Sequence, residues 1–237
     1  LVGDTLNNIG YFLCGIGKLD RAMEHLWEAL RVRKLNNAYE KVAGTLNNLG
    51  NVHKELNEYS MAIECYQEAL RVRQNTLDLG DDDGVGDTYF NMGGLYLLQG
   101  DFENATECFE ECLRIRIDLL GKDHIKVADG HLNMVELHLK KKEENMALLR
   151  LEEVLRIKKQ AYGDIHEDVA TTICNMGIVY NRKGDRTSAM QKYEEALNIF
   201  IAAGVGRENP FVEKLIRATR KCKIEQAQKG SKFRFFN

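Results

Sequence analysis

The chain has 237 residues, 44% of them hydrophobic, which is enough to bury a sizeable core. Its 33 lysines and arginines nearly balance 36 aspartates and glutamates, so it lacks the one-signed charge that would favour binding to nucleic acid or to anionic lipid. A single proline, only 8% aromatic residues and no apolar run close to the roughly 18 residues of a membrane span predict an all-helical protein without membrane insertion.

Six cysteines are scattered through predicted helices and do not follow the spacing of a disulfide framework. They predict free thiols in a reducing compartment, so we expect a cytoplasmic protein. The closest pair, Cys108 and Cys112, has no further ligand nearby to complete a metal site, which favours a packing role. No secretory leader opens the sequence, but it begins at Leu1 and not at methionine, so a leader outside it stays an open alternative.

A short motif that ends in glycine recurs along the chain. Residues 6–10 read Leu-Asn-Asn-Ile-Gly and residues 46–50 read Leu-Asn-Asn-Leu-Gly. Related motifs follow at 90–93, 132–135 and 174–177, with steps of 43, 42 and 42 residues after a first step of 40. The spacing predicts one continuous body over 1–209 made of five repeats, at about 2–41, 42–84, 85–126, 127–168 and 169–209. We call the last residue of each motif the glycine position: Gly10, Gly50, Gly93, Val135 and Gly177.

Small and large residues alternate at fixed distances after the glycine position. Twelve residues later the chain always has alanine: Ala22, Ala62, Ala105, Ala147 and Ala189. Sixteen residues later it has a large apolar residue: Leu26, Tyr66, Phe109, Leu151 and Tyr193. This alternation is typical of two packed helices.

Turn residues separate the two predicted helices of each repeat. Seven residues after the glycine position come Gly17, Asn57, Gly100, Lys142 and Gly184, four of which tolerate a left-handed helix end. Three residues further come the predicted N-cap positions: Asp20, Ser60, Glu103, Asn145 and Thr187. Each repeat is therefore predicted to be a helix, a tight turn and a second helix.

The order leucine, glycine, aromatic, alanine, aromatic, alanine resembles the tetratricopeptide repeat (TPR) over nearly the whole chain. The period exceeds the usual length of about 34 residues. The segments Ala-Leu-Arg-Val-Arg at 69–73 and Leu-Gly-Lys-Asp-His at 120–124 resemble the longer repeats of kinesin light chains. The resemblance implies an all-α fold, a right-handed superhelical α-solenoid of five TPR helix-turn-helix repeats plus a C-terminal capping helix.

The fourth repeat departs most from the others. It has Val135 at the glycine position, Lys142 at the turn and Glu144 where repeats one to three have a large apolar residue. We expect the stack to be softest there, and residues 140–144 to form either a local joint, a partner surface or a solvated turn.

Beyond the repeats, Pro210 is predicted to begin a capping helix over 210–228. Its apolar stripe comprises Phe211, Leu215, Ile216, Thr219 and Cys222. The tail at 229–237 contains three phenylalanines, and it is either docked on a neighbouring surface or a frayed end.

Asparagine stands two residues before the glycine position in every repeat: Asn8, Asn48, Asn91, Asn133 and Asn175. Asparagine is a mediocre helix former, so five in the same position require a reason. The resemblance implies that these asparagines contact the main chain of a bound peptide on the concave side of the stack. The structural alternative is that they bridge adjacent helices, and the two roles can coexist.

Charged residues flank this asparagine ladder. Asp4, Asp87 and Asp129 fall in the first turns of the first helices, and Lys54, Lys140, Lys141, Lys142, Arg182 and Lys183 fall at their ends. The two groups predict either acidic and basic edges that orient a ligand, with Lys54, Lys140 and Arg182 as peptide contacts, or charges that complement the helix dipoles.

A second basic series lies at the ends of the second helices, where ion pairs are favoured over a ligand site: Arg31 and Arg33, Arg71 and Arg73, Arg114 and Arg116, Arg156 and Lys158. Asn198 and Phe200 end this series in repeat five.

These features predict a noncatalytic scaffold or adaptor that binds a protein or peptide partner, as an extended peptide or a helix in the concave groove. The alternative is a structural subunit of a larger multi-protein assembly that uses the convex face, the helix edges or the tail. No enzyme, metal or cofactor is expected, because the six histidines fall in no nucleophile or metal motif. The acidic run at 80–87 lacks the glutamate that would close a calcium loop.

Overall fold

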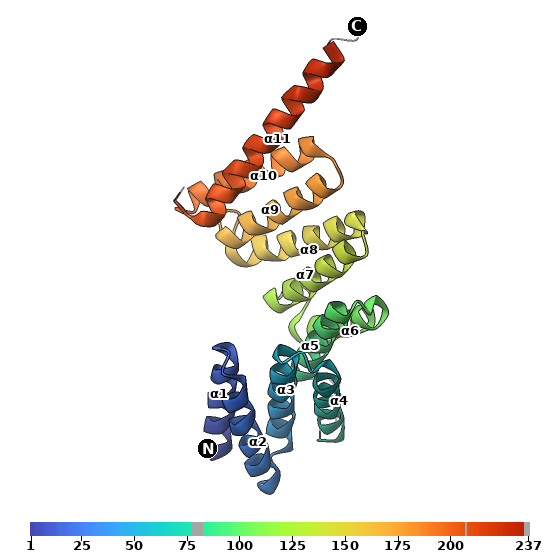
Figure 1. Ribbon diagram of the computed structural model, residues 1–237, viewed down its shortest axis with the longest axis vertical. Helices are drawn as coiled ribbons and strands as arrows, with labels where there is room; N and C mark the ends of the chain where they lie inside the picture. Colours follow the sequence, from blue (N-terminus) through green and yellow to red (C-terminus); the bar gives the residue numbers. More distant parts are fainter. Residues whose placement is uncertain (77–82, 207, 235–237) are drawn as a thin grey trace. The chain divides into compact units, whose positions relative to one another are not determined.

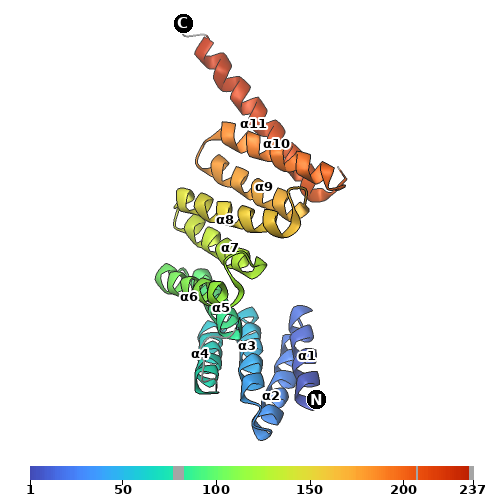
Figure 2. The same ribbon diagram turned by 180° about the vertical axis from the view of Figure 1, so that it is seen from behind.

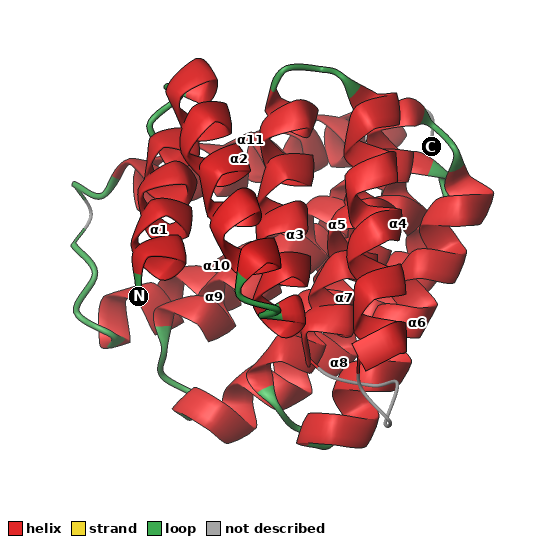
Figure 3. Cartoon of the chain, turned by 90° about the horizontal axis from the view of Figure 1, so that it is seen from below, coloured by secondary structure: helices red, strands yellow, loops and turns green. Residues whose placement is uncertain are grey.

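The computed structural model describes residues 1–76, 83–206 and 208–234, and within these ranges the chain forms eleven α-helices and no strand (Figures 1 and 3). The helices form five antiparallel hairpins and one final helix, as the repeats predict. Residues 80–82 of the acidic run at 80–87 lie outside the described residues. The hairpins are α1 (Val2–Gly15) with α2 (Leu19–Leu35), α3 (Tyr39–Glu55) with α4 (Tyr59–Thr76), α5 (Asp83–Gln99) with α6 (Phe102–Leu120), α7 (Ile125–Lys140) with α8 (Glu144–Tyr162), and α9 (Glu167–Arg182) with α10 (Arg186–Ala202), followed by α11 (Pro210–Arg234).

The chain packs as two compact units, Leu1–Gly121 and Lys122–Asn237, where the sequence predicts one continuous body. The first unit contains α1 to α6 and the second α7 to α11, as can be followed from both sides in Figures 1 and 2. The division falls in the connection between repeats three and four. It does not fall at 140–144, where a local joint was one of the expectations. Residues 141–143 form the exposed or half-exposed turn of the α7–α8 hairpin, inside the second unit.

The turn inside each hairpin contains one residue with positive φ, and all five lie at the predicted position. They are Gly17 (74°), Asn57 (62°), Gly100 (78°), Lys142 (61°) and Gly184 (82°). The prediction of a left-handed turn residue is therefore confirmed. Lys142 also adopts this conformation, although lysine does not favour it. Glycine and asparagine tolerate this conformation, whereas a residue such as lysine pays about 1–2 kcal/mol for it, so the fourth turn is the costliest.

The predicted N-caps were wrong by two residues. The side chain of Asp101 accepts a hydrogen bond from the Asn104 amide at 3.2 Å, and that of Asp185 accepts one from the Ser188 amide at 3.0 Å. Both caps directly follow the turn glycine, because the Asp101 amide already donates to the Tyr96 carbonyl at 2.9 Å and closes α5. The five predicted residues are instead the second residues of their helices: Asp20, Ser60, Glu103, Asn145 and Thr187.

The core of each hairpin is built on the predicted small and large positions. The five alanines are fully buried, and the five large residues that follow them are at most 4% exposed. A β-carbon at Gly93 would lie 2.5 Å from the Phe109 ring, and one at Gly50 would lie 2.4 Å from Tyr66. The glycine position therefore lets the second helix approach the first closely. In repeat four, Val135 and Leu151 share one core cluster and fill the same space without an aromatic ring.

Helix α11 begins at Pro210 as predicted and covers α10 with buried Val212, Leu215, Thr219 and Cys222. Phe200, which replaces the basic residue of the other repeats, packs edge-to-face against Phe211 with ring centroids 5.5 Å apart. The helix continues to Arg234, so residues 229–234 are helical where the sequence predicts a tail, and residues 235–237 lie outside the described residues. Figure 1 shows the C-terminal half of α11 extending beyond α10.

Candidate functional site

The asparagine ladder lies on the surface of both units. In the first unit Asn8 is on α1, Asn48 on α3 and Asn91 on α5, and in the second Asn133 is on α7 and Asn175 on α9. Asn8 is exposed and the other four are half-exposed, so none of the five is buried. Within each unit, solvent therefore reaches these side-chain amides.

One member of the ladder joins two helices. The amide Nδ2 of Asn48 donates to Oδ1 of Asn7 at 3.0 Å, which links α3 to α1. This contact is the bridging role of the structural alternative, although the partner is Asn7 and not Asn8. Among the residues that the structure describes, the other four ladder side chains form no hydrogen bond within the chain. Their donor and acceptor groups are thus available to another molecule.

The three basic candidates differ in their surroundings. Lys140 and Arg182 each follow a ladder asparagine by seven residues, two turns along the same helix face, and both are exposed. Arg182 Nη2 also donates to the Leu139 carbonyl at 3.0 Å, which ties α9 to the end of α7. In the first unit, Glu55 takes the place seven residues after Asn48, and Lys54 Nζ lies 3.4 Å from its carboxylate. The cationic groups available on the ladder face are therefore those of the second unit.

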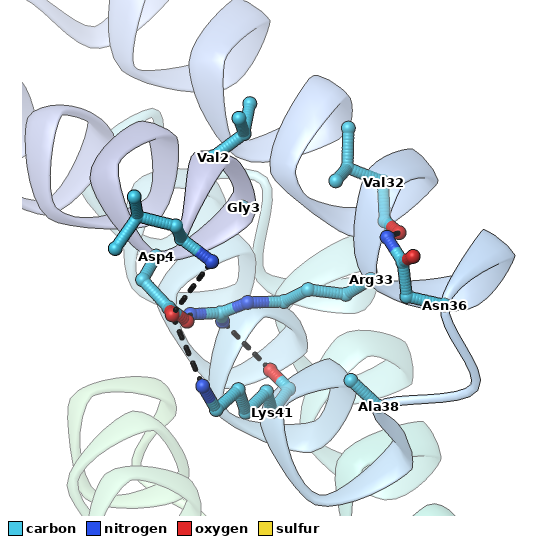
Figure 4. Close-up of a pocket in the computed structure, with 9 residues that line it drawn as sticks. Val2, Gly3, Asp4, Val32, Arg33, Asn36, Ala38 and Lys41 are labelled. Atoms are coloured by element: carbon cyan, nitrogen blue, oxygen red, sulfur yellow. Dashed lines mark hydrogen bonds and ion pairs between the residues drawn. The ribbon is translucent and has the colours of Figure 1, made fainter.

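Two of the three acidic residues are bound to buried arginines. Asp4 lies 2.9 Å from Arg33 Nη2 and 3.0 Å from Lys41 Nζ, as Figure 4 shows, and Asp87 lies 2.8 Å from Arg116 Nη2. Hydrogen bonds from Lys41 and then from Arg33 lower the pKa of Asp4 to about 2. A cavity of about 360 Å³ adjoins this cluster at the ends of α1, α2 and α3. These carboxylates primarily join helices, which weakens the interpretation of an acidic groove edge.

The arginine series of the second helices splits into a buried and an exposed set. The exposed arginines bind a glutamate one turn earlier in the same helix: Arg31 with Glu28, Arg71 with Glu68, Arg114 with Glu111, and Arg156 with Glu153. The buried set comprises Arg33, Arg73, Arg116 and Lys158. Arg33 Nη1 donates to the Lys41 carbonyl at 2.7 Å and to Thr45 Oγ1 at 2.5 Å, so it also joins α2 to α3 of the next repeat. The expected ion-pair role is found in both sets.

A cavity beside the ladder was not anticipated from the sequence. It has a volume of about 430 Å³ and lies between α1 and α3. Its lining comprises Tyr11, Phe12, Cys14 and Gly15 of α1, Ile16 directly after that helix, and Asn48 and Asn51 of α3. The sequence feature that could have indicated this cavity is the Tyr11–Phe12 pair directly after the first glycine motif, because no other repeat has two aromatic residues there. The first unit thus presents an apolar cavity next to a ladder asparagine.

Most histidines have structural contacts. His53 and His138 are buried, with Nδ1 at 2.6 Å from Glu58 and 2.8 Å from Glu143, and the hydrogen bond from His138 lowers the pKa of Glu143. His124 caps α7 by accepting from the Lys126 amide. In the part of the chain that the structure describes, no three histidine, cysteine or acidic side chains gather as a metal site.

The buried cysteines have the environment of packed thiols. Burial raises the pKa of Cys108 to about 12 and the pKa values of Cys112 and Cys174 to about 11. A thiol is nucleophilic only as its thiolate, so these three groups are unreactive near neutral pH. As for membranes, none of the described helices combines the length and the apolar character of a bilayer span.

Comparisons with known proteins agree with this architecture. No curated protein matches the chain. Solved structures with a similar fold include BtubC (BKLC) from P. vanneervenii, at 20% identity and TM-score 0.64, with 91% of each chain covered. They also include a Podosopora anserina protein described by its nearly identical kinesin light chain TPR-like repeats, at 15% identity and TM-score 0.70, covering 83% of this chain and 93% of that one. The apo form of RapI matches at 15% identity and TM-score 0.67, covering all of this chain and 75% of its own.

These structural likenesses concern the fold, including the long repeats of the kinesin light chain type. The family itself is shown by a sequence model described as tetratricopeptide repeat, which matches residues 1–75, 84–160 and 131–202. Together the three matches cover most of the chain, and they extend from α1 to α10. The chain therefore belongs to the tetratricopeptide repeat family.

Proposed function

We propose that this chain is a noncatalytic adaptor that holds an extended peptide or a partner helix along its first helices. The tetratricopeptide fold is in general a scaffold for protein interactions, which supports the broad class. The single observation that carries the proposal is the ladder: five asparagines at one position, all of them accessible, four of them without a partner inside the described chain.

The chemistry of the ladder suits a peptide main chain. Each side-chain amide offers two donors and one acceptor, which match the carbonyl and amide groups of an extended segment whatever its sequence. Such contacts hold the ligand, while neighbouring groups select its side chains. In the second unit Lys140 and Arg182 favour acidic side chains, and in the first unit the cavity next to Asn48 favours an apolar one.

We place this adaptor in the cytoplasm, where its six thiols stay reduced. A protein or peptide is the expected partner, since the overall charge of −3 gives no advantage for nucleic acid.

The test is a pull-down from native extract with Asn48, Asn91 and Asn133 changed together to alanine. Alanine is the better helix former, so the variant should remain folded by circular dichroism while it loses most of its partners. The matched control is Asn198→Ala, an exposed asparagine on the second helix α10, which should recover partners like the wild type. If the folded triple variant recovers its partner proteins as well as the wild type does, the proposal is wrong.

The alternative role, a subunit of a larger assembly that uses the convex face, the helix edges or the tail, is favoured by the extension of α11 beyond α10 (Figure 1). It predicts that deleting residues 231–237 abolishes assembly, measured by size-exclusion chromatography of the native complex, while the triple asparagine variant still assembles. The adaptor role predicts the opposite pair of results.

A further inference from the structure

The two compact units carry opposite net charges. Residues 1–121 contain 11 lysines and arginines against 20 aspartates and glutamates, which gives a net charge of −9. Residues 122–237 contain 22 against 16, which gives a net charge of +6. The charge of −3 on the whole chain is therefore the sum of two parts of opposite sign. Each copy of the chain offers another copy a surface of complementary charge.

The exposed side of α11 is basic. It presents five exposed lysines and arginines between residues 214 and 223. Arg217 binds Glu213 of the same helix, and Lys223 Nζ lies 2.6 Å from the carboxylate of Glu194 on α10. Within the described residues the other three have no acidic partner, and we call them the unpaired cations of α11: Lys214, Arg220 and Lys221.

The residues of this basic side do not fit the second helix of a hairpin. The apolar stripe of α11 repeats the buried stripe of α9 forty-three residues earlier, with Val212 in the place of Val169. The same step puts Arg220 where α9 has Gly177. A β-carbon at Gly177 would lie 2.6 Å from the Tyr193 ring of α10, so an arginine at this position excludes a helix packed as closely. The basic side of α11 is thus a surface because of its own side chains.

The first unit has exposed glutamates at one position of its second helices. Fourteen residues after the glycine position come Glu24 of α2, Glu64 of α4 and Glu107 of α6, and all three are exposed. In the part of the chain that the structure describes, none of them forms an ion pair or a hydrogen bond through its side chain. The second unit has Leu149 and Gln191 at this position, so the glutamate series belongs to the first unit alone.

We propose that the basic side of α11 is a docking surface for the glutamate series of a second copy of this chain. The unpaired cations of α11 then gain the acidic partners that they lack within their own chain. The two surfaces are different parts of one chain, so the contact is heterologous and each copy keeps one free surface of each kind. Copies therefore add head to tail, and the assembly grows with protein concentration.

The distribution of charge and apolar surface favours this occupant over lipid and nucleic acid. The apolar stripe of α11 is buried on α10 and does not reach a bilayer, although membrane-bound amphipathic helices require such a stripe at the lipid interface. The net charge of −9 on the first unit repels a phosphate backbone, whereas it attracts the basic side of α11 in another copy.

Sedimentation velocity of the full chain over a range of protein concentrations tests the contact. In about 10 mM salt, where the Debye length is about 30 Å, the average sedimentation coefficient should rise with concentration. In about 1 M salt, where this length is about 3 Å, it should stay at the monomer value. A monomer at every concentration in low salt overturns the proposal.

The single tryptophan reports on the place of the contact. Trp27 is 50% exposed and lies one turn after Glu24 on α2. A helix docked on the glutamate series excludes water from its ring, so its emission should shift to shorter wavelength as the protein associates in low salt. Association without any change in Trp27 emission would place the contact elsewhere and overturn the proposal.

Charge reversal separates this contact from general electrostatic attraction. Changing the three unpaired cations of α11 together to glutamate should weaken association about tenfold or more. A matched control alters the net charge by the same amount at three other exposed lysines of the second unit, and it should weaken association far less. These lysines are Lys122, Lys141 and Lys142. Equal losses in the two triple variants overturn the proposal, provided that circular dichroism shows both to be folded.

A chain with exchanged charges provides the decisive comparison. It combines the reversal on α11 with Glu24→Lys, Glu64→Lys and Glu107→Lys, so its net charge is that of the wild type. The two surfaces are again complementary, and association should return. If it does not return, the glutamate series is not the docking partner of α11.

Other anionic ligands are the competing occupants of the basic side. The probes are vesicles of phosphatidylcholine and phosphatidylserine, and a short DNA duplex. If the chain stays monomeric in low salt but binds one of these probes through the unpaired cations of α11, the surface belongs to that ligand and the proposal is overturned. No ladder asparagine takes part in the contact, so changing Asn48, Asn91 and Asn133 to alanine should leave sedimentation unaltered. Failure of the adaptor role and failure of this contact are therefore distinguishable.

Discussion

Glycine at the same position of four repeats is required by a facing side chain and not by backbone conformation. At Gly93 a β-carbon would lie 2.5 Å from the Phe109 ring, which is buried and cannot move without disturbing the hairpin. At Gly94, the next residue of α5, a β-carbon would meet nothing within 4 Å. Two adjacent glycines of one helix therefore differ only in what they face.

Gly93→Ala is accordingly expected to destabilise the chain by about 1–3 kcal/mol through overpacking. Gly94→Ala should stabilise it by about 0.5–1 kcal/mol, because alanine costs less backbone entropy in a helix. Urea unfolding followed by circular dichroism measures both. Shifts of the same sign for the two variants would show that Phe109 does not restrict this position.

Single residues also show what sequence patterns leave undetermined. The position of each turn was predictable because glycine and asparagine mark a left-handed residue, and Lys142 followed from the period alone. The N-caps were misplaced because aspartate, serine and threonine are frequent both at a cap and in the first turn that follows it. Only the closure of the turn, through the Asp101 amide and the Tyr96 carbonyl, decides between the two positions.

At the scale of helices, adjacent repeats are joined by buried cations as well as by apolar contact. Arg33 joins three helices: from its place on α2 it binds Asp4 of α1 and donates to the Lys41 carbonyl and the Thr45 hydroxyl of α3. Arg31, two residues earlier, is exposed and binds only Glu28 on its own helix. The sequence shows two basic residues with the same spacing in four repeats, an arginine pair in three of them and Arg156 with Lys158 in the fourth, so only burial separates their roles.

Arg33→Met should therefore cost roughly 2–3 kcal/mol of unfolding free energy, less than a fully buried pair because Asp4 is partly solvated. Arg31→Met should leave the unfolding free energy nearly unchanged, as expected for an exposed ion pair within one helix. Thermal and urea unfolding of the two variants, side by side with the wild type, provides the comparison. Equal losses would mean that the contacts of Arg33 between helices do not stabilise the stack.

For the whole molecule, the repeats were predictable but the division into two units was not. Five motifs in one period were enough to predict the helices, the hairpins and the accessible ladder on the first helices. The connections after α6 and after α8 are nearly identical: Gly121 and Gly163 both have positive φ, and each is followed three residues later by a histidine N-cap. Nothing in the local sequence distinguishes the two connections. Packing over many residues therefore places the boundary between the units after α6 and not after α8.

This difference predicts different outcomes for two cuts at equivalent glycines. A cut after Gly163 divides a core cluster in which Leu148 and Leu151 of α8 pack with Met176 and Val179 of α9. The fragment 164–237 should therefore lose much of its helical circular dichroism or aggregate, because the stripe of α9 becomes exposed. A cut after Gly121 follows the boundary between the compact units, and fragments 1–121 and 122–237 should each keep their helicity and unfold cooperatively. If 122–237 is unfolded while 164–237 folds, the second unit is not the autonomous body that its packing indicates.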